Sequence, residues 1–316
     1  MKTATLIYNP VAGRDPRRRE QQIKDATAVL EEHGFRVKPA RTKGPGCASG
    51  IAQEAVSSGA DLVLACGGDG TVNEVVNGLT PSAVPLAILP GGTANIVANE
   101  LRLPHNPVQA AHELVKWTPR RIALGKATGK PTIPACRDSG NVERYFISVA
   151  GLGFDAYVIH RLGIKFKMSF GVTAYVVEGL RQLMRYRFHP IYCQVDSQRY
   201  VATLALVQRT SLYAGWFKTA PYQSITVPRF SLSLFRSRRW FRYIAYGLAV
   251  VTQRQLHDVD RMEASNVSFA AADPGAEIFF ELDGELAGVL PASIEIVPDA
   301  LTLLMPDETN RTGRFD

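Results

Sequence analysis

The chain has 316 residues, of which 46% are hydrophobic and 21% charged, a composition that excludes a disordered or fibrous protein. Its N-terminus lacks an apolar core followed by a cleavage site, and no apolar stretch approaches the ~18 residues of a spanning helix, so we expect a cytoplasmic protein. The net charge is +7, but residues 156–257 alone carry +13, with fifteen Lys and Arg against Glu178 and Asp196. This regional charge indicates an anionic partner, either nucleic acid or lipid headgroups, unless it is only a solvated basic face.

The first third of the chain alternates short apolar runs with helical patterns. Strands are expected at ATLIYNP, FRVKPARTK, DLVLACGG and VPLAILPGG, and helices at residues 17–33, residues 46–58, TVNEVVNGL and TANIVANEL. The first helix places Ile23, Ala26, Val29 and Leu30 on one face, and Gly34 ends it. Because the strands are apolar throughout and alternate with helices, they predict an α/β fold with a doubly wound parallel sheet.

Beyond about Thr118 the segments become β-branched, aromatic and separated by turn residues. Strands are expected at RRIALGKAT, ERYFISVAG, HPIYCQVD, RYVATLALV, FSLSLF, AEIFFELDGE and ASIEIVP, and helices at about 155–186 and 237–253. Single cores stop growing near ~250–300 residues, so we expect two domains. The first is the α/β domain over residues 1–122, to which the tail 306–316 can return, and the second is a mainly antiparallel, β-sandwich-like domain over residues 123–305.

Three glycine-bearing loops follow strands of the first domain: NPVAG at 9–13, GGDGT at 67–71 and LPGGTAN at 89–95. In parallel sheets ligands bind at the carboxyl ends of the strands, so we expect the loops to form one trough for a polyanion. Glycines let backbone N–H groups approach phosphates closely, and each helix N-terminus adds ~0.3–1 kcal/mol per favourable charge. Asp69 would repel phosphate unless Mg²⁺ lies between them or the carboxylate orients a hydroxyl or water. The alternative is that Asp69 only caps the helix that follows.

N-P-x-A-G, G-G-D-G-T-x-N-E-V-V-N-G and L-P-x-G-T-x-N, in this order, resemble the diacylglycerol kinase catalytic family, which also contains sphingosine and ceramide kinases and the bacterial lipid kinases. VAGLGFDAYV, FKTAP and ELDGELAGVLPASIEIVPDALTLLMP extend the resemblance over nearly the whole chain. GGDGT alone is not specific, because NAD kinases and phosphofructokinases share it. The resemblance implies a lipid kinase, a phosphotransferase with an alcohol acceptor, that uses ATP and Mg²⁺.

The resemblance also implies the site residues. The nucleotide site would consist of Asn9, Pro10, Ala12, Gly13, Thr42, Gly67, Gly68, Asp69, Gly70, Thr71, Asn73, Gly92 and Thr93. Asp69, Asp283 and Glu285 would be catalytic, with Glu285 accepting the proton of the lipid hydroxyl, and Asp155 would be a headgroup or network residue. The residues alone allow plainer roles, since Asp283-Gly284 is the signature of a type I′ hairpin turn and Asp155 can cap a helix.

The segment APYQSITVPRFSLSLF departs from the family, because members commonly carry an acidic residue there as part of a structural Mg²⁺ site. No carboxylate stands in it here, so the resemblance does not transfer a second, structural metal to this chain. Catalytic Mg²⁺ that arrives with ATP is unaffected.

Basic and aromatic residues alternate in SRRWFRYIAYGLAVV and RQLMRYRFH. Aromatic rings settle at the headgroup boundary and each cation adds ~1 kcal/mol against an anionic leaflet, so we expect peripheral association with an anionic membrane surface. Such mixtures also bind single-stranded nucleic acid, but no recognised nucleic-acid motif accompanies them, and we expect no nucleic-acid partner. Alternatively, Ile244, Leu248 and Val251 belong to the core.

We therefore expect a two-domain lipid kinase that transfers the γ-phosphoryl group of ATP to a lipid hydroxyl, with diacylglycerol the first choice of acceptor. The alternatives are an enzyme of the NAD kinase type with a soluble substrate, and a catalytically silent regulator that binds nucleotide or membrane. The sequence does not specify the lipid, because acyl-chain pockets are built from interchangeable apolar side chains. It does not specify the oligomeric state either.

Overall fold

The computed structural model describes residues 2–13, 16–132, 140–162, 175–252, 254 and 257–307. The chain forms two compact units, the first comprising Met1–Ala123 and Asp299–Asp316 and the second Leu124–Pro298. The chain first passes from the first unit to the second after residue 123, whereas the expected domain boundary follows residue 122. Residues 299–305, expected in the second domain, belong to the first unit, and most of the expected tail, from residue 308 onward, lies outside the described residues.

The first unit is built on a parallel sheet with the strand order β17-β4-β3-β1-β2. Its strands are β1 (Lys2–Tyr8), β2 (Phe35–Arg41), β3 (Leu62–Gly67), β4 (Leu86–Pro90) and the end of β17 (Glu285–Met305). β3 and β4 are buried along their whole length, as strands covered on both faces should be. The predicted doubly wound parallel sheet is confirmed.

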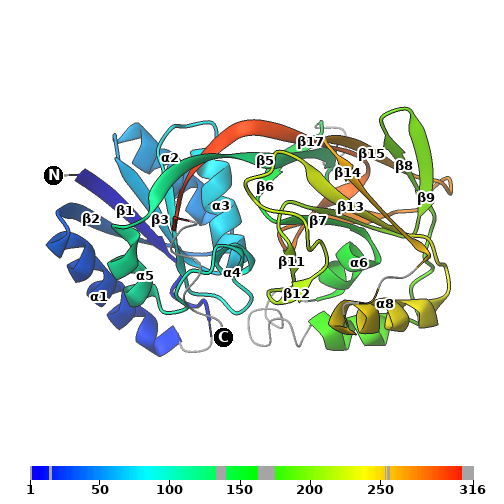
Figure 1. Ribbon diagram of the computed structural model, residues 1–316, viewed down its shortest axis with the longest axis horizontal. Helices are drawn as coiled ribbons and strands as arrows, with labels where there is room; N and C mark the ends of the chain where they lie inside the picture. The colour runs from blue at the N-terminus through cyan, green and yellow to red at the C-terminus, as the bar shows by residue number, and fades with distance from the viewer. Residues whose placement is uncertain are drawn as a thin grey trace. The chain divides into compact units, whose positions relative to one another are not determined.

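Helices cover both faces of this sheet. They are η1 (Pro16–Arg18), α1 (Arg19–Glu32), α2 (Cys47–Ser57), α3 (Asp69–Leu79), α4 (Ile96–Glu100) and α5 (Pro107–Leu114). α1 packs with α5 and α2 with α3, and Figure 1 shows the two pairs on opposite faces. The predicted apolar face of α1 is buried. α5 was not predicted, although Asn106 caps it by accepting from the Val108 N–H and Pro107 opens it, which are both start signals.

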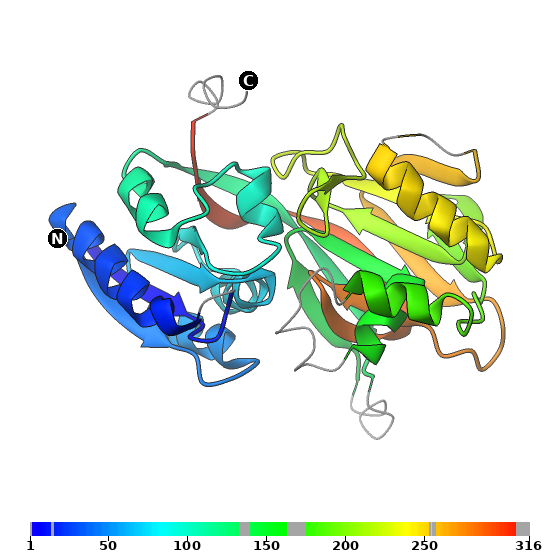
Figure 2. The same cartoon turned by 90° about the horizontal axis from the view of Figure 1, so that it is seen from below.

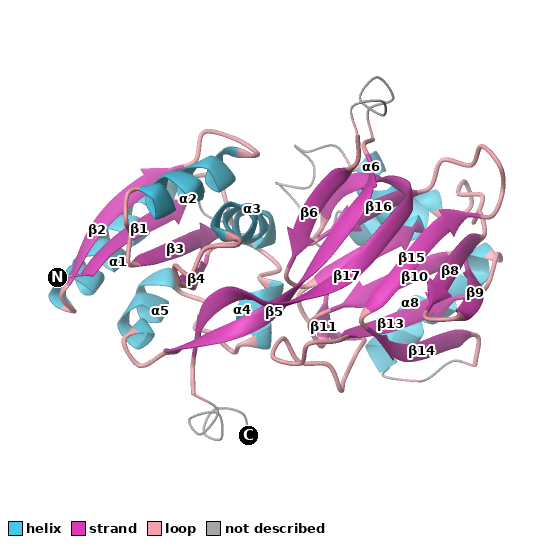
Figure 3. Cartoon of the chain, turned by 90° about the horizontal axis from the view of Figure 1, so that it is seen from above, coloured by secondary structure: helices cyan, strands magenta, loops and turns pink. Residues whose placement is uncertain are grey.

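The second unit is an antiparallel assembly with the strand order β14-β13-β10-β7-β16-β17, to which β15, β8 and β9 add through β17, and β5 and β6 likewise (Figure 3). The strands are β5 (Thr118–Lys130), β6 (Val142–Phe146), β7 (Val149–Gly153), β8 (Ile191–Val195), β9 (Gln198–Ala202), β10 (Leu204–Gln208), β13 (Phe230–Phe235), β14 (Val259–Ala264), β15 (Asn266–Ala271) and β16 (Phe279–Leu282), with a ribbon of β11 (Leu212–Tyr213) and β12 (Phe217–Lys218). β14 and β15 were not predicted, because charged and small polar residues interrupt their apolar pattern.

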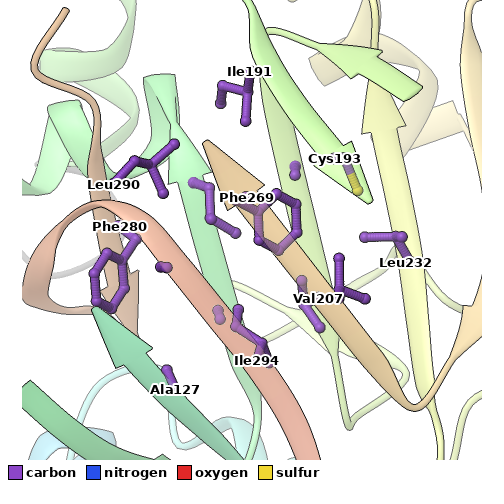
Figure 4. Packing of buried hydrophobic residues seen from close by; sticks show 14 of the residues in the cluster. Ala127, Ile191, Cys193, Val207, Leu232, Phe269, Phe280, Leu290 and Ile294 are labelled. Carbon is purple, nitrogen blue, oxygen red and sulfur yellow. The ribbon is translucent and has the colours of Figure 1, made fainter. Parts of the chain in front are cut away.

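Two apolar clusters are the larger ones among the described residues of the second unit, beside a small third one. One lies among the strands, where Figure 4 shows Phe269, Phe280 and Ile294 pointing into it. The other packs the strands against α6 (Phe154–Arg161) and α8 (Trp240–Thr252), with the Phe188 and Tyr243 rings 4.2 Å apart. Of the expected helix over 155–186, the structure describes α6, which ends at Arg161, and helix over 175–182, while residues 163–174 lie outside the described part.

A buried guanidinium organises the acid-free segment that follows the A-P dipeptide. Arg209 has no exposed surface and donates to the carbonyl oxygens of Ile225 (2.7 Å), Val227 and Arg229 (2.9 Å). Burial lowers the pKa of Arg209 to about 10, so the side chain stays cationic at neutral pH. Three carbonyl groups of this segment therefore face an internal cation, and Arg209 holds the segment in place.

Candidate active site

The three glycine loops of the first unit pack backbone against backbone. A Cβ atom on Gly92 would lie 2.4 Å from Gly68 Cα, and one on Gly13 would lie 2.6 Å from the Gly91 carbonyl oxygen. The Gly91 N–H donates to the Gly67 carbonyl over 2.9 Å. No side chain larger than the hydrogen atom of glycine fits at these contacts. The glycines therefore allow the loops after β1, β3 and β4 to meet at one edge of the sheet.

Asp69 joins the second loop to the third. It is the first residue of α3, and its Oδ1 accepts from the Ile96 N–H at the start of α4 over 2.6 Å. Asp69 therefore connects the loop after β3 to the start of α4, a contact that the sequence did not predict. The carboxylate is half-buried among glycine backbones.

The other residues assigned to the nucleotide site fall into two groups. The first group lies in the glycine loops and is half-buried or exposed; it consists of Asn9, Pro10, Ala12, Gly13, Gly68, Gly70, Gly92 and Thr93. Thr42, Thr71 and Asn73 are buried; the Asn73 Oδ1 accepts from Asn77 within α3 over 3.2 Å, and the Thr71 side chain lies beside Gly67. Asn95, which was not assigned, ties both backbone groups of Gly92 through its amide at 2.8 and 2.9 Å.

Asp283 and Gly284 form the turn between β16 and β17 in the second unit. Their φ angles are +50° and +82° and Leu282 pairs with Glu285, as the predicted type I′ turn requires. The Asp283 carboxylate is only 3% exposed and accepts three backbone N–H groups, from residues 147, 148 and 149, at 2.8 to 3.0 Å. A carboxylate so enclosed fixes the turn against the loop between β6 and β7.

Glu285 is the carboxylate of this turn that reaches solvent. Its side chain is 31% exposed, and its Oε2 lies 3.1 Å from Nη2 of Arg144, a residue of β6. Arg144 was missed in the sequence, where it stands in an ordinary strand pattern with no local mark of its partner. The ion pair holds the Glu285 carboxylate in one orientation.

Asp155 lies buried in a hydrogen-bonded network, and its contact with a lipid headgroup stays a prediction. It is 3% exposed, and its Oδ1 accepts the hydroxyl groups of Tyr175 and, over 2.6 Å, Tyr213. A Cβ on Gly151 would lie 1.9 Å from Asp155 Oδ2 and 2.7 Å from Glu281 Oε1, so both carboxyl groups occupy the space that this glycine leaves. Glu281, also missed in the sequence, is 1% exposed and accepts the Gly284 N–H over 2.6 Å.

Burial raises the pKa of Asp155, against the opposing hydrogen bonds from the two tyrosines and Glu281. Folding thus favours the protonated acid, and the stability that this contributes is complete below the ordinary pKa of 3.8 and is lost as the pH rises through the higher folded pKa. As the pH rises through this range, we expect the free energy of unfolding to fall less for Asp155→Asn than for the unmodified protein. Urea unfolding from pH 4 to pH 8 measures this, with Asp196→Asn, on an exposed turn, as the control. Identical pH dependence in the Asp155 variant would refute the assignment of the raised pKa.

Two features bear on membranes and metals. No helix among the described residues is long and apolar enough to cross a bilayer. The same described residues contain no group of three His, Cys, Asp or Glu side chains that could hold a metal ion without other ligands. Mg²⁺ bound to ATP needs only one or two carboxylates besides the phosphates, so Asp69 fits that use.

Family models match both parts of the chain. The diacylglycerol kinase catalytic domain matches residues 3–127, and the YegS C-terminal NAD kinase beta sandwich-like domain matches residues 148–305. A diacylglycerol kinase of Bacillus subtilis (strain 168) is 28% identical over 98% of both chains, and one of Staphylococcus saprophyticus is 24% identical over 97% of this chain and 96% of its own.

A solved structure shares the fold of this chain. A crystal structure of a Bacillus anthracis (strain Sterne) protein, named a diacylglycerol kinase, has a TM-score of 0.70 at 21% identity and covers 98% of each chain. At this identity the likeness concerns the fold alone. The matched family models, together with relatives that align over nearly the full length, show that this chain belongs to the diacylglycerol kinase catalytic family and is a lipid kinase-type phosphotransferase.

Proposed function

We propose that the protein transfers the γ-phosphoryl group of ATP to the hydroxyl of a lipid, with diacylglycerol as the first choice of acceptor. The observation that carries the proposal is the direct contact of three glycine loops at one sheet edge, joined through Asp69. The names of the relatives from Bacillus subtilis and Staphylococcus support the choice of acceptor.

The glycine loops supply the nucleotide site in this proposal. Backbone N–H groups of Gly68 and Gly70 can approach phosphate oxygens without Cβ obstruction, and the N-terminal end of α3 adds its positive dipole. Thr71 packs behind the second loop, since a Cβ on Gly67 would meet its side chain at 2.6 Å. Little covalent chemistry is asked of the protein in phosphoryl transfer, so positioning of this kind supplies much of the catalysis.

Magnesium would enter with ATP and be held by Asp69, whose oxygen donor suits a hard cation. When bound, Mg²⁺ neutralises charge on the phosphates. Asp69 would thereby serve a cation and the start of α4 together, which explains a carboxylate beside phosphate-binding glycines.

We assign Glu285 the role of general base, which accepts the proton of the acceptor hydroxyl. As the lipid hydroxyl attacks the γ-phosphorus and the bond to the β-phosphate oxygen breaks, the hydroxyl proton passes to a Glu285 carboxylate oxygen and ADP leaves. Arg144 orients that carboxylate, and Asp283 contributes by holding the turn, because backbone N–H groups already occupy its oxygens.

The test is transfer from γ-labelled ATP by the purified full chain to an acceptor panel. The panel contains vesicles with diacylglycerol, ceramide or sphingosine, vesicles without an acceptor, and NAD in solution, and products are identified by mass. We expect labelled lipid, with diacylglycerol the best acceptor. Label on NAD would favour the soluble-substrate alternative, and ATP binding without transfer to any acceptor would favour the silent regulator; either result contradicts the proposal.

We further propose that an exposed apolar stripe on α8 contacts an anionic membrane. Trp240, Phe241, Ile244, Leu248 and Val251 are 40 to 61% exposed. The alternative that Ile244, Leu248 and Val251 belong to the core is therefore wrong; Tyr243 and Tyr246 fill the core from this helix.

A second exposed apolar group accompanies the stripe. Val176, Val177, Leu180 and Met184 are 48 to 75% exposed. Figures 1 and 2 place α8 and the helix at 175–182 on the same side of the second unit's strands. Because this unit also carries the excess of arginine, apolar insertion and attraction to anionic lipid would act together.

Leu248→Glu combined with Val251→Glu should weaken binding to phosphatidylglycerol vesicles by roughly tenfold or more, because each residue would contribute ~1.5 kcal/mol or more on insertion. Co-sedimentation at several salt concentrations measures this, and binding should weaken as salt rises. Val201→Glu is the matched control, since Val201 is 48% exposed on β9. Undiminished binding of the double variant would exclude α8 as the contact.

A further inference from the structure

Arg19, at the first position of α1, contacts the glycine loops after β1 and β4 and the end of β3. Its Nη2 donates to the carbonyl oxygens of Ala12 (3.0 Å) and Gly91 (2.7 Å), and its Nη1 lies 3.7 Å from the Sγ of Cys66, the residue before Gly67. The side chain is 5% exposed. Arg19 thus links the loops after β1 and β4 to the end of β3, from which the third loop starts, although it belongs to none of them.

The loops leave room for this guanidinium through glycine. A Cβ on Gly91 would lie 3.0 to 3.1 Å from three guanidinium atoms, and a Cβ on Gly13 would lie 3.0 Å from Nη2. Larger residues at either position would push the side chain away from the loop backbones. The glycines at 13 and 91 therefore admit a buried cation as well as the close approach of the loops.

The charge of Arg19 has no counter-ion among the residues that the structure describes. Its hydrogen-bond partners are two neutral carbonyls and the Cys66 thiol, which stays neutral because burial raises its pKa to about 11. Within the same described part, the Nε atom is buried without a hydrogen-bond acceptor. Burying an uncompensated cation costs several kcal/mol, a cost that an anion bound at the adjoining loops would offset.

We propose that Arg19 is the positioning residue of the triphosphate site: it fixes the spacing of the three loops whose amides bind the phosphates, and its charge adds to their attraction for the anion. This inference rests on the proposed function. A purely structural role would require Arg19 for stability alone, with no selective effect on ATP.

The test compares Arg19→Met and Arg19→Lys with Arg17→Met, which removes the same charge two residues away at an exposed position. For each protein we would measure the Kd for ATP by calorimetry, the KM for ATP and for diacylglycerol in vesicles, and the midpoint of urea unfolding. We expect Arg19→Met to raise the Kd and KM for ATP by about tenfold or more, because it removes a charge and two carbonyl contacts. The KM for diacylglycerol should not change.

Arg19→Lys should fall between the unmodified protein and Arg19→Met, since lysine keeps the charge but not the fork of donors. Arg17→Met should match the unmodified protein. A folded Arg19→Met that binds ATP as the unmodified protein does overturns the inference and leaves the proposed function intact. If Arg19→Met does not fold, Arg19→Lys decides, and an unchanged Kd for ATP overturns the inference. Failure of the unmodified protein to bind ATP would instead overturn the proposed function.

Discussion

Glu285→Gln should reduce phosphoryl transfer to the lipid by about 10²-fold or more, because a glutamine amide cannot accept the hydroxyl proton and a positioned base contributes 10²–10⁴. The amide oxygen can still accept a hydrogen bond from Arg144, and the turn is held by Asp283, so the fold should be retained. The affinity for ATP should also be retained, since Glu285 is not among the residues assigned to the nucleotide site. Initial rates with γ-labelled ATP, together with the Kd for ATP, separate the two effects.

Glu263→Gln is the matched control for this substitution. Glu263 also lies on a strand and pairs with an arginine, Arg229, at 2.6 Å, but it is 65% exposed. It should keep the full rate. Near-normal transfer by Glu285→Gln, or an equal loss in both variants, would remove Glu285 from the role of base.

Asp69→Asn should lose phosphoryl transfer by roughly 10²-fold or more while keeping its stability. The asparagine oxygen can still accept the Ile96 N–H, but the negative charge that would hold Mg²⁺ is gone. Asp69→Ala should lose transfer to a similar degree and also about 1 kcal/mol of stability, because the start of α4 loses its acceptor. Comparing the two variants separates the charge of Asp69 from its capping contact.

The measurements are initial transfer rates over a range of Mg²⁺ concentrations and urea unfolding of each variant. Asp61→Asn is a suitable control, since Asp61 also accepts a backbone N–H, that of Thr3, at 2.7 Å in the same unit. If Asp69→Asn transfers phosphate at the normal rate while Asp69→Ala does not, Asp69 serves only as a cap and its assignment to Mg²⁺ is refuted.

Much of the fold follows from local pattern. Apolar strands that alternate with amphipathic helices predicted the parallel sheet of the first unit, and Asp283-Gly284 predicted a turn whose φ angles are both positive. These features depend on residues adjacent in sequence or on one periodic face. Strand β14 was missed because prediction depends on this local pattern, and the charged residues of β14 hide the alternation that a strand should show.

The partners of the site residues could not be predicted, because they come from distant parts of the chain. Arg144 and Glu285 are 141 positions apart, and Arg19 reaches Gly91 across 72. Glu281 gives no local sign that its carboxyl group lies beside Asp155, since that contact depends on Gly151 of a neighbouring strand. Motifs identify which residues matter chemically, whereas the residues that orient them are found only once the sheet brings the segments together.

The central claim, that the three glycine loops bind the triphosphate, is tested most directly by hydrogen exchange of the full chain with and without a non-hydrolysable ATP analogue and Mg²⁺. The account predicts slower exchange of backbone amides at 9–13, 67–71 and 91–95 when the analogue is present. Saturating binding with no protection in any of these three segments would contradict it.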